Sequence, residues 1–429
     1  MAKIGIVFKD ELYRVVDEAF EYLGSQQSNS NGKRGWHQFL ESGKIGNIAT
    51  AQILILYLSF RRAIPSLDSC LASFEENRRE IIWKSEKIVG WSYLSSGPAV
   101  PCIEPTCWVC LAYQALSIPE TVKLQSEVRA FLNATKIVSQ DGVSWGYTPW
   151  TEPRVSPTCA AIRVLSRIGD LKLVGEALRW LLSARDSQGL WGPTSKANAT
   201  ITHTSLAVLA LKQAGYAPTN PALINGYSFL KNRLQRWLSS NKPFETPRSD
   251  LIGFSEIAEV PPFPNLAHRP TRLQYFFNPD LLSAIALSTN VDAHFPYLEA
   301  VGIQAIKDWD TIRWKHTLLR EHQHVTSWSF YDHMVALEPL YRKWASDRKS
   351  GVFFCLSSKY LFSRRIYLLS NIFRVFRNQN ILILFRVTSF SLFFIVLIYF
   401  IFNKIDFKTL LITVILGVVS NVVYSYLKS

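Results

Sequence analysis

Apolar residues recur with helical spacing in four segments of the chain, and each segment follows a loop that contains polar residues or glycine and a tryptophan. The segments read GNIATAQILILYL, EPTCWVCLAYQAL, SPTCAAIRVLSRIG and ITHTSLAVLALKQAGY. Each loop tryptophan is followed 20 positions later by a leucine, in the pairs Trp36 and Leu56, Trp91 and Leu111, Trp145 and Leu165, and Trp191 and Leu211. Successive tryptophans are 55, 54 and 46 residues apart, a period that suits one pair of helices per repeat.

Two further segments, residues 277–288 and 327–340, have a weaker form of the same pattern. A Thr or Asn ahead of several runs is typical of the residue that caps a helix N-terminus. The sequence therefore predicts an all-α protein of about six helical-pair repeats, in which the apolar face of each repeat packs against its neighbours.

The C-terminal pattern is different, because two long runs carry no charge. They span residues 387–402 and 409–427, and the short segment 403–408 joins them. A helix of about 20 residues crosses the roughly 30 Å hydrocarbon layer of a bilayer. Buried core helices are the alternative, but both runs are apolar on nearly every side. The runs predict a two-helix transmembrane hairpin with the lipid bilayer as its partner, and the hairpin could also form homo-oligomers.

The distribution of the +14 net charge supports this division of the chain. Residues 342–386 carry ten basic residues and one acid, whereas residues 1–341 have a net charge of only +3. A nearly neutral first part argues against a nucleic-acid-binding face. Because cationic segments stay on the cytoplasmic side, we expect a two-span membrane protein with both termini in the cytoplasm. The predicted domains are a helical domain at 1–341, a basic amphipathic connector at 342–386 and the hairpin at 387–427.

Composition is typical of a folded intracellular protein. Hydrophobic residues make up 48% of the 429 residues and aromatic residues 13%, so the chain can bury a large core. The six cysteines are unevenly spaced, and acidic residues near the N-terminus replace the apolar core of a secretory signal. A reduced setting without a disulfide framework is therefore expected.

Three segments around the loop tryptophans, EYLGSQQSNSNGKRGW, VSQDGVSWGY and WLLSARDSQGLWG, carry a family resemblance. They resemble the glutamine-and-tryptophan repeat of squalene and hopene cyclases, related diterpene cyclases and protein prenyltransferase β subunits, over roughly residues 10–340. The resemblance implies an α/α toroid whose inner and outer helices surround an apolar cavity, which in that family holds an isoprenoid. Arg185 stands where the fourth repeat should have its glutamine. We expect the four repeat tryptophans to stack loops against helix ends rather than to line the cavity.

Cyclases of this family that protonate an alkene use clustered aspartates, Asp-x-Asp-Asp followed by Thr, at the start of an inner helix. The matching run here is Arg154, Val155, Ser156, Pro157 and Thr158, which contains none of these aspartates. The chain has no Asp-Asp dipeptide, so the metal-chelating motif of ionisation-type terpenoid synthases is missing as well. The resemblance therefore implies a cavity with Arg154, Ser156 and Thr158 at its mouth and without the proton source of the family.

Three carboxylates are candidates for a replacement acid: Asp308, Asp310 and Glu104. On a helix Asp308 and Asp310 would point about 200° apart, which favours solvated charges over a shared site. Glu104 aligns with Thr158 and Thr204 of the next repeats, so a helix cap is its alternative role. The cysteine and histidine patterns lack a matching second set of ligands, so we predict no metal and no cofactor.

Together these features predict a membrane-anchored toroid that binds an isoprenoid or another apolar ligand without protonation-driven cyclase activity. An active terpenoid cyclase with a non-standard acid is one alternative. The other is a scaffold that senses a protein or peptide and is coupled to a membrane-perturbing hairpin, as in bacterial stress or antiviral defence. The sequence leaves open whether the chain is an enzyme.

Overall fold

The computed structural model describes residues 2–30, 32–93, 100–239, 255–259, 270–274, 279–315 and 325–348. They belong to one compact unit, Met1–Gly351, and a second unit comprises Val352–Ser429. The hairpin predicted at 387–427 and the connector beyond residue 348 lie outside the described residues. In the part that is described, no helix has both the length and the apolar character needed to cross a bilayer.

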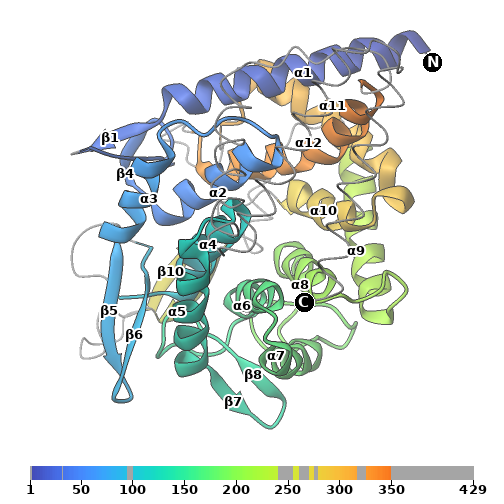
Figure 1. Cartoon of the computed structure of the whole chain (residues 1–429). Helices are drawn as coiled ribbons and strands as arrows, with labels where there is room; N and C mark the ends of the chain where they lie inside the picture. The colour runs from blue at the N-terminus through green and yellow to red at the C-terminus, as the bar shows by residue number, and fades with distance from the viewer. Residues whose placement is uncertain are drawn as a thin grey trace, which may run out of the picture. The chain divides into compact units, whose positions relative to one another are not determined.

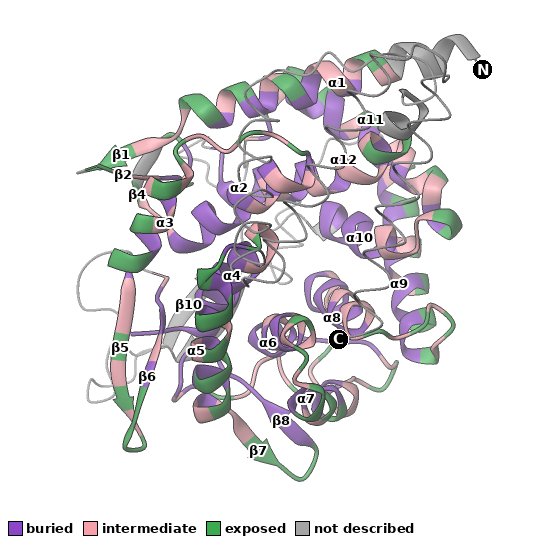
Figure 2. Cartoon of the chain, viewed as in Figure 1, coloured by how far each residue is buried: buried purple, intermediate pink, exposed green. Residues whose placement is uncertain are grey.

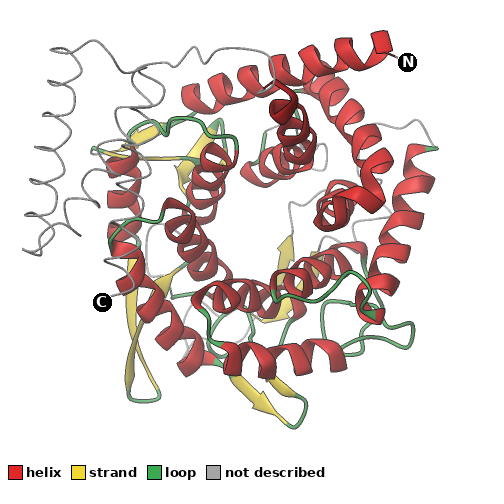
Figure 3. Cartoon of the chain, turned by 45° about the vertical axis from the view of Figure 1, so that its right-hand side comes forward, coloured by secondary structure: helices red, strands yellow, loops and turns green. Residues whose placement is uncertain are grey.

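The described residues of the first unit form twelve α-helices in two concentric layers (Figure 1, Figure 3). The inner layer consists of α2 (Asn47–Ser59), α4 (Ile103–Leu116), α6 (Val155–Ile168), α8 (Ile201–Gln213), α10 (Pro279–Leu287) and α12 (Ser327–Arg348). Each inner helix contacts the next one, and α12 also contacts α2, so this layer is a closed ring. The outer layer consists of α1 (Ala2–Ser25), α3 (Leu67–Glu76), α5 (Glu120–Thr135), α7 (Leu171–Ser183), α9 (Pro221–Leu238) and α11 (Val291–Ile312). Outer and inner helices alternate along the chain, which gives the mostly helical toroid of six pairs.

Five short antiparallel hairpins occur where the sequence indicated only loops. They are β1 (Ser28–Ser30) with β2 (Lys33–Gly35), β3 (His37–Phe39) with β4 (Ser42–Ile45), β5 (Arg78–Trp83) with β6 (Glu86–Trp91), β7 (Ile137–Ser139) with β8 (Gly142–Ser144), and β9 (Ser255–Glu259) with β10 (Pro270–Gln274). A short 3₁₀ helix, η2 (Ser288–Asn290), follows α10. Gly142 is required in its hairpin, because its φ is +129° and an added Cβ would lie 2.2 Å from the carbonyl oxygen of Glu176.

Burial explains which helices form the inner ring. Ten of the thirteen residues of α2 are buried, and α4 is buried along nearly its whole first three turns. A helix that is apolar on all sides must be covered on all sides. The outer helices α5 and α7 bury six of sixteen and six of thirteen residues on one face, and their other face is exposed (Figure 2). Burial thus distinguishes the inner helices α2 and α4 from the outer helices α5 and α7.

Each repeat tryptophan ties an outer helix to the start of the next inner helix. The indole N–H groups of Trp36, Trp91, Trp145, Trp191 and Trp314 donate to carbonyl oxygens of Leu23, Phe74, Leu132, Leu181 and Ala305 at 2.7 to 2.8 Å. In four repeats a threonine of the inner helix accepts a hydrogen bond from the tryptophan backbone N–H, in the pairs Trp36 and Thr50, Trp91 and Thr106, Trp145 and Thr158, and Trp191 and Thr204. These bonds satisfy polar groups that are buried in the layer interface.

The first and last repeats close the ring. The backbone N–H of Leu40 donates to the carbonyl oxygen of Val325 at 2.9 Å, and Phe39 forms a β-bridge with Thr326. The outer helix α1 contacts α11 in the outer layer and α12 in the inner layer. Helix α12 continues to Arg348, beyond residue 341, where the sequence indicated the end of the toroid.

Candidate ligand site

A cavity of about 240 Å³ lies inside the ring, with walls formed by α4, α6, α8, α10, η2 and α12. Aliphatic side chains form the walls on the α8, α10 and α12 sides: Leu206, Leu209, Leu282, Ile285 and Val335. The volume is slightly below the roughly 300–1,000 Å³ typical of small-molecule pockets. Polar side chains line the cavity as well: Glu104, Ser156, Arg163, Ser288, Thr289 and Asp332.

Glu104 is a buried carboxyl in the wall of this cavity. Its side chain extends from the first turn of α4, and the residue is 8% exposed. Ser156 donates a hydrogen bond to its Oε1, and the hydroxyl of Tyr93 donates to its Oε2 at 2.5 Å. Burial raises the pKa of Glu104, and the two hydroxyl bonds offset only part of this effect. Glu104 therefore keeps its proton to a higher pH than an exposed glutamate does.

Glu104 does not occupy the repeat position of Thr158 and Thr204, with which the sequence aligned it. Thr106, and not Glu104, bonds to the backbone of its repeat tryptophan in the way that Thr158 does in the next repeat. Counting back two residues from each threonine makes Glu104 the counterpart of Ser156. The alignment of Glu104 with Thr158 is therefore wrong, because the second repeat has two more residues between its tryptophan and threonine. Glu104 binds side chains rather than capping the helix.

This carboxyl also corrects the expectation of a cavity without an acid. Ser156 occupies the second aspartate position of the Asp-x-Asp-Asp motif, and the structure places the carboxyl of Glu104 against it. The acid comes from α4, the neighbouring inner helix, and no motif on α6 could reveal it. A second carboxyl, that of Asp332 on α12, also lines the cavity and is 1% exposed.

Aromatic side chains form another wall. The ring of Trp108 packs edge-to-face against Trp328 at 5.9 Å and against Tyr331 at 5.3 Å between centroids. The guanidinium of Arg163 lies 5.5 Å from the centre of the Trp108 ring. None of these four residues is predicted from the sequence, because the sequence does not show which face of an inner helix meets the cavity. In the sequence, only their positions on inner helices could have identified them as site residues.

The other predicted mouth residues do not line the cavity. Arg154 is the residue before α6, its side chain is 12% exposed, and it forms an ion pair with Glu152 at 3.7 Å. Thr158 is bonded to the backbone of Trp145. Of the three, Ser156 alone lines the cavity. The repeat tryptophans Trp36, Trp91, Trp145 and Trp191 are fully buried at the layer interface, where their N–H groups bind outer-helix carbonyls.

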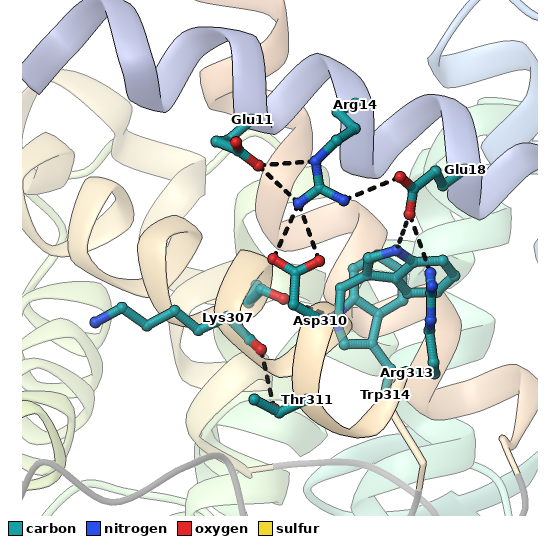
Figure 4. Close-up of polar contacts among 10 residues, drawn as sticks. Glu11, Arg14, Glu18, Lys307, Asp310, Thr311, Arg313 and Trp314 are labelled. Atoms are coloured by element: carbon teal, nitrogen blue, oxygen red, sulfur yellow. Dashed lines mark hydrogen bonds and ion pairs between the residues drawn. The ribbon is translucent and has the colours of Figure 1, made fainter.

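Asp308 and Asp310 lie on α11 in the outer layer. Both carboxylate oxygens of Asp310 accept hydrogen bonds from Arg14 of α1 at 2.9 Å (Figure 4). Asp308 is 1% exposed and accepts a hydrogen bond from Gln304 at 2.7 Å. Neither side chain lines the central cavity. Asp310 thus joins two helices of the outer layer, whereas the hydrogen bond of Asp308 with Gln304 lies within α11.

The same outer network includes Glu18 of α1. Its carboxylate accepts hydrogen bonds from the indole N–H of Trp309 at 2.8 Å and from Arg313 at 3.0 Å (Figure 4). The hydrogen bond from Trp309, with those from Arg14 and Arg313, lowers the pKa of Glu18 to about 2. Across the described residues, no group of three His, Cys, Asp or Glu side chains is arranged to hold a metal ion.

Comparison with known proteins supports the fold. No protein-family model matches the sequence, and no match is found among curated proteins. Among solved structures, a family 76 glycoside hydrolase from a bovine Bacteroides thetaiotaomicron strain is similar with a TM-score of 0.50 and 10% sequence identity, over 78% of each chain. At this identity the likeness shows the toroid fold alone.

Two further solved structures are similar with lower scores. A variant of the type II terpene cyclase MstE from Scytonema has a TM-score of 0.46 and 12% identity, over 79% of this chain and 98% of the cyclase. The protein geranylgeranyltransferase-I of Candida albicans has a TM-score of 0.42 and 12% identity, over 68% of this chain and 83% of that chain.

Proposed function

We propose that the toroid binds an apolar, isoprenoid-like ligand in its central cavity and that Glu104 acts there as a neutral acid. The observation that carries the proposal is the position of Glu104, a carboxyl buried in a cavity whose other walls are largely aliphatic and aromatic. Such walls favour an apolar ligand, and a few convergent polar groups fix its orientation.

The chemistry of Glu104 favours contact with an oxygen atom of the ligand over protonation of an alkene. Burial raises the pKa of Glu104, which makes its carboxyl a weaker proton donor than that of an exposed glutamate. Alkene protonation needs a strong acid, and the positive charge of Arg163 would destabilise a carbocation in the same cavity. A neutral carboxyl is well suited to donate a hydrogen bond to a ligand hydroxyl or carbonyl. The proposal is therefore a ligand-binding toroid with a weak acid, without cyclisation of a polyene.

Binding of farnesol to the purified full chain tests this proposal. We expect saturable binding to the wild type and strong loss of binding in Leu209→Trp, because the larger side chain would fill the cavity. Leu171→Trp is the matched control, since Leu171 lies on the outer helix α7 and is 79% exposed. Equal binding by all three proteins would place the ligand elsewhere and refute the proposal. Gas chromatography of the bound fraction would show whether farnesol is changed.

A second candidate function follows from the two carboxyls in the cavity. Glu104 and Asp332 could act as the acid and the second carboxylate that most glycoside hydrolases use. Nine of the sixteen lining residues are aliphatic or aromatic, which weighs against a sugar. Release of nitrophenol from aryl glycosides, lost in both Glu104→Gln and Asp332→Asn, would favour hydrolysis over simple binding. Absence of release would leave the ligand-binding proposal as the better account.

The membrane anchor belongs to the same proposal. An isoprenoid dissolves in lipid rather than in water, so a bilayer-anchored toroid would have access to it through the proposed hairpin at 387–427. The alternative of a peptide sensor with a membrane-perturbing hairpin rests on the missing motif and on the ease with which a two-helix hairpin oligomerises, and the buried Glu104 weakens only the first of these reasons. Expression of the full chain and of a chain without residues 381–429 distinguishes the two: dye leakage that needs the hairpin favours the sensor.

A further inference from the structure

Arg163 is a cation in the cavity wall for which the described residues provide no anionic partner. It extends from α6, lines the cavity and is partly exposed. Glu104 and Asp332 line the same cavity, yet no described carboxylate lies within ion-pair distance of Arg163. A guanidinium is always charged, and removing a charge from water without a partner is unfavourable. A negatively charged ligand group would supply that partner.

The aromatic wall points to the same sign of charge. The guanidinium of Arg163 lies over the face of Trp108, which is the part of the ring that attracts cations. Arg163 therefore already occupies the face of the Trp108 ring, and it would repel a second cation nearby. An anion would be attracted, and stacking on Trp108 holds the guanidinium so that its remaining N–H groups can donate to the anion.

The charge balance favours an anion with a single charge. Burial raises the pKa of Glu104, which lowers the share of this carboxyl that carries a negative charge at a given pH. Asp332 has other polar contacts in the protein. One guanidinium neutralises one negative charge, and a carboxylate matches its planar, bidentate geometry. A phosphate monoester carries about −1.5 to −2 charges at pH 7, more than Arg163 alone can neutralise.

The positions of the polar groups define where the charged end would lie. Arg163 is seven residues after Ser156 on α6, so both lie on one face, with their Cα atoms about 10 Å apart along the axis. The guanidinium nevertheless reaches Trp108, which is only one turn after Glu104 on α4. The anion would therefore lie within about one helical turn of the Glu104 carboxyl, and the aliphatic chain would contact Leu206, Leu209 and Ile285.

We infer that the ligand is a singly charged amphiphile, an apolar chain that ends in a carboxylate, and that Arg163 binds its charged end. This inference rests on the proposed function and adds the chemical class of the ligand. It makes Arg163 the residue that distinguishes an acid from the corresponding alcohol.

The test compares three ligands that share one chain: farnesol, farnesoic acid and farnesyl monophosphate. Each is titrated into the purified full chain at neutral pH by calorimetry. We expect farnesoic acid to bind about tenfold more tightly than farnesol, because a charge-assisted bidentate bond is gained. In Arg163→Gln the two affinities should become nearly equal, and Arg163→Lys should restore part of the preference. Arg167→Gln is the matched control, since Arg167 lies one turn further on α6 and does not line the cavity.

The outcomes separate this inference from the proposed function. Equal binding of farnesol and farnesoic acid to the wild type would overturn the inference and leave the proposed function standing. A preference for the acid that persists in Arg163→Gln would overturn it as well. Tightest binding of farnesyl monophosphate would refute the single charge. Failure of all three ligands to bind would refute both the inference and the proposed function.

Discussion

The hydroxyl of Ser156 on α6 donates a hydrogen bond to the carboxyl of Glu104 on α4, and the two residues occupy equivalent positions in consecutive repeats. In the family that the sequence resembles, the acid belongs to the inner helix that corresponds to α6. Here the carboxyl comes from the preceding repeat and is held against the same helix. The cavity thus contains an acid although the motif itself is absent.

Ser156→Ala removes one of the two hydroxyls that bind Glu104. We expect unfolding free energy to fall by about 1–3 kcal/mol, because a buried polar atom loses its partner. The pKa of Glu104 should rise further, since the Ser156 bond lowers it. Urea unfolding and the carbonyl band of the protonated acid in the infrared measure the two effects. Ser166→Ala on the same helix is the control: its hydroxyl bonds only within α6, and we expect a change within about 0.5 kcal/mol.

Glu104→Gln should change how stability depends on pH. The folded-state pKa of Glu104 lies above its ordinary value of 4.5, so folding favours the protonated form. Its contribution is complete below pH 4.5 and is lost as pH rises through the folded pKa. Glutamine cannot titrate, so the variant should lose less stability than the wild type over that rise. Thermal unfolding at a series of pH values measures the difference, and parallel curves for the two proteins would contradict a raised pKa.

Thr158→Val tests the repeat contact. The threonine hydroxyl accepts from the backbone N–H of Trp145 at 3.0 Å and donates to its carbonyl oxygen at 3.3 Å, and valine keeps the shape without either bond. We expect a loss of about 1–3 kcal/mol in urea unfolding, because the Trp145 N–H is left unsatisfied in the core. Thr135→Val is the control, since its hydroxyl bonds only to Phe131 one turn earlier in α5. A loss in Thr158→Val no larger than in the control would show that the contact is dispensable.

Asp310→Ala separates the outer layer from the cavity. The side chain of Asp310 is 46% exposed and pairs with Arg14 at 2.9 Å, so we expect a stability loss below about 1 kcal/mol that shrinks as salt is added. Farnesol binding should be unchanged, because Asp310 does not line the cavity. Calorimetry at two salt concentrations checks both statements. If the variant folds normally but no longer binds farnesol, Asp310 contributes to the ligand site and the prediction is wrong.

The repeat could be predicted from the sequence because it depends on a local pattern, whereas the inner and outer layers were implied by the family resemblance. The constant spacing from Trp145 to Leu165 reflects one structural unit, a loop followed by an inner helix. A helix that is apolar on all sides, such as α2, is expected to lie in the inner layer. The hairpins escaped prediction, since three-residue strands such as Ile137–Ser139 are too short to show alternation.

The site could be predicted only in part. A fixed repeat period aligned Glu104 with Thr158, because two extra residues between Trp91 and Thr106 are invisible until the hydrogen bonds are known. Arg163 is one of two arginines on α6, and the sequence does not reveal which face of this helix meets the cavity. The partner of Asp310 lies 296 positions away, beyond any local pattern.

Photo-crosslinking tests the central claim most directly. A farnesol analogue with a diazirine on its chain is irradiated with the purified full chain, and the modified peptides are identified by mass spectrometry. The account predicts modification of cavity-lining positions such as Trp108, Leu209 and Val335, prevented by excess farnesol and lost in Leu209→Trp. Modification confined to the outer helices, or unaffected by farnesol, would contradict a ligand site inside the ring.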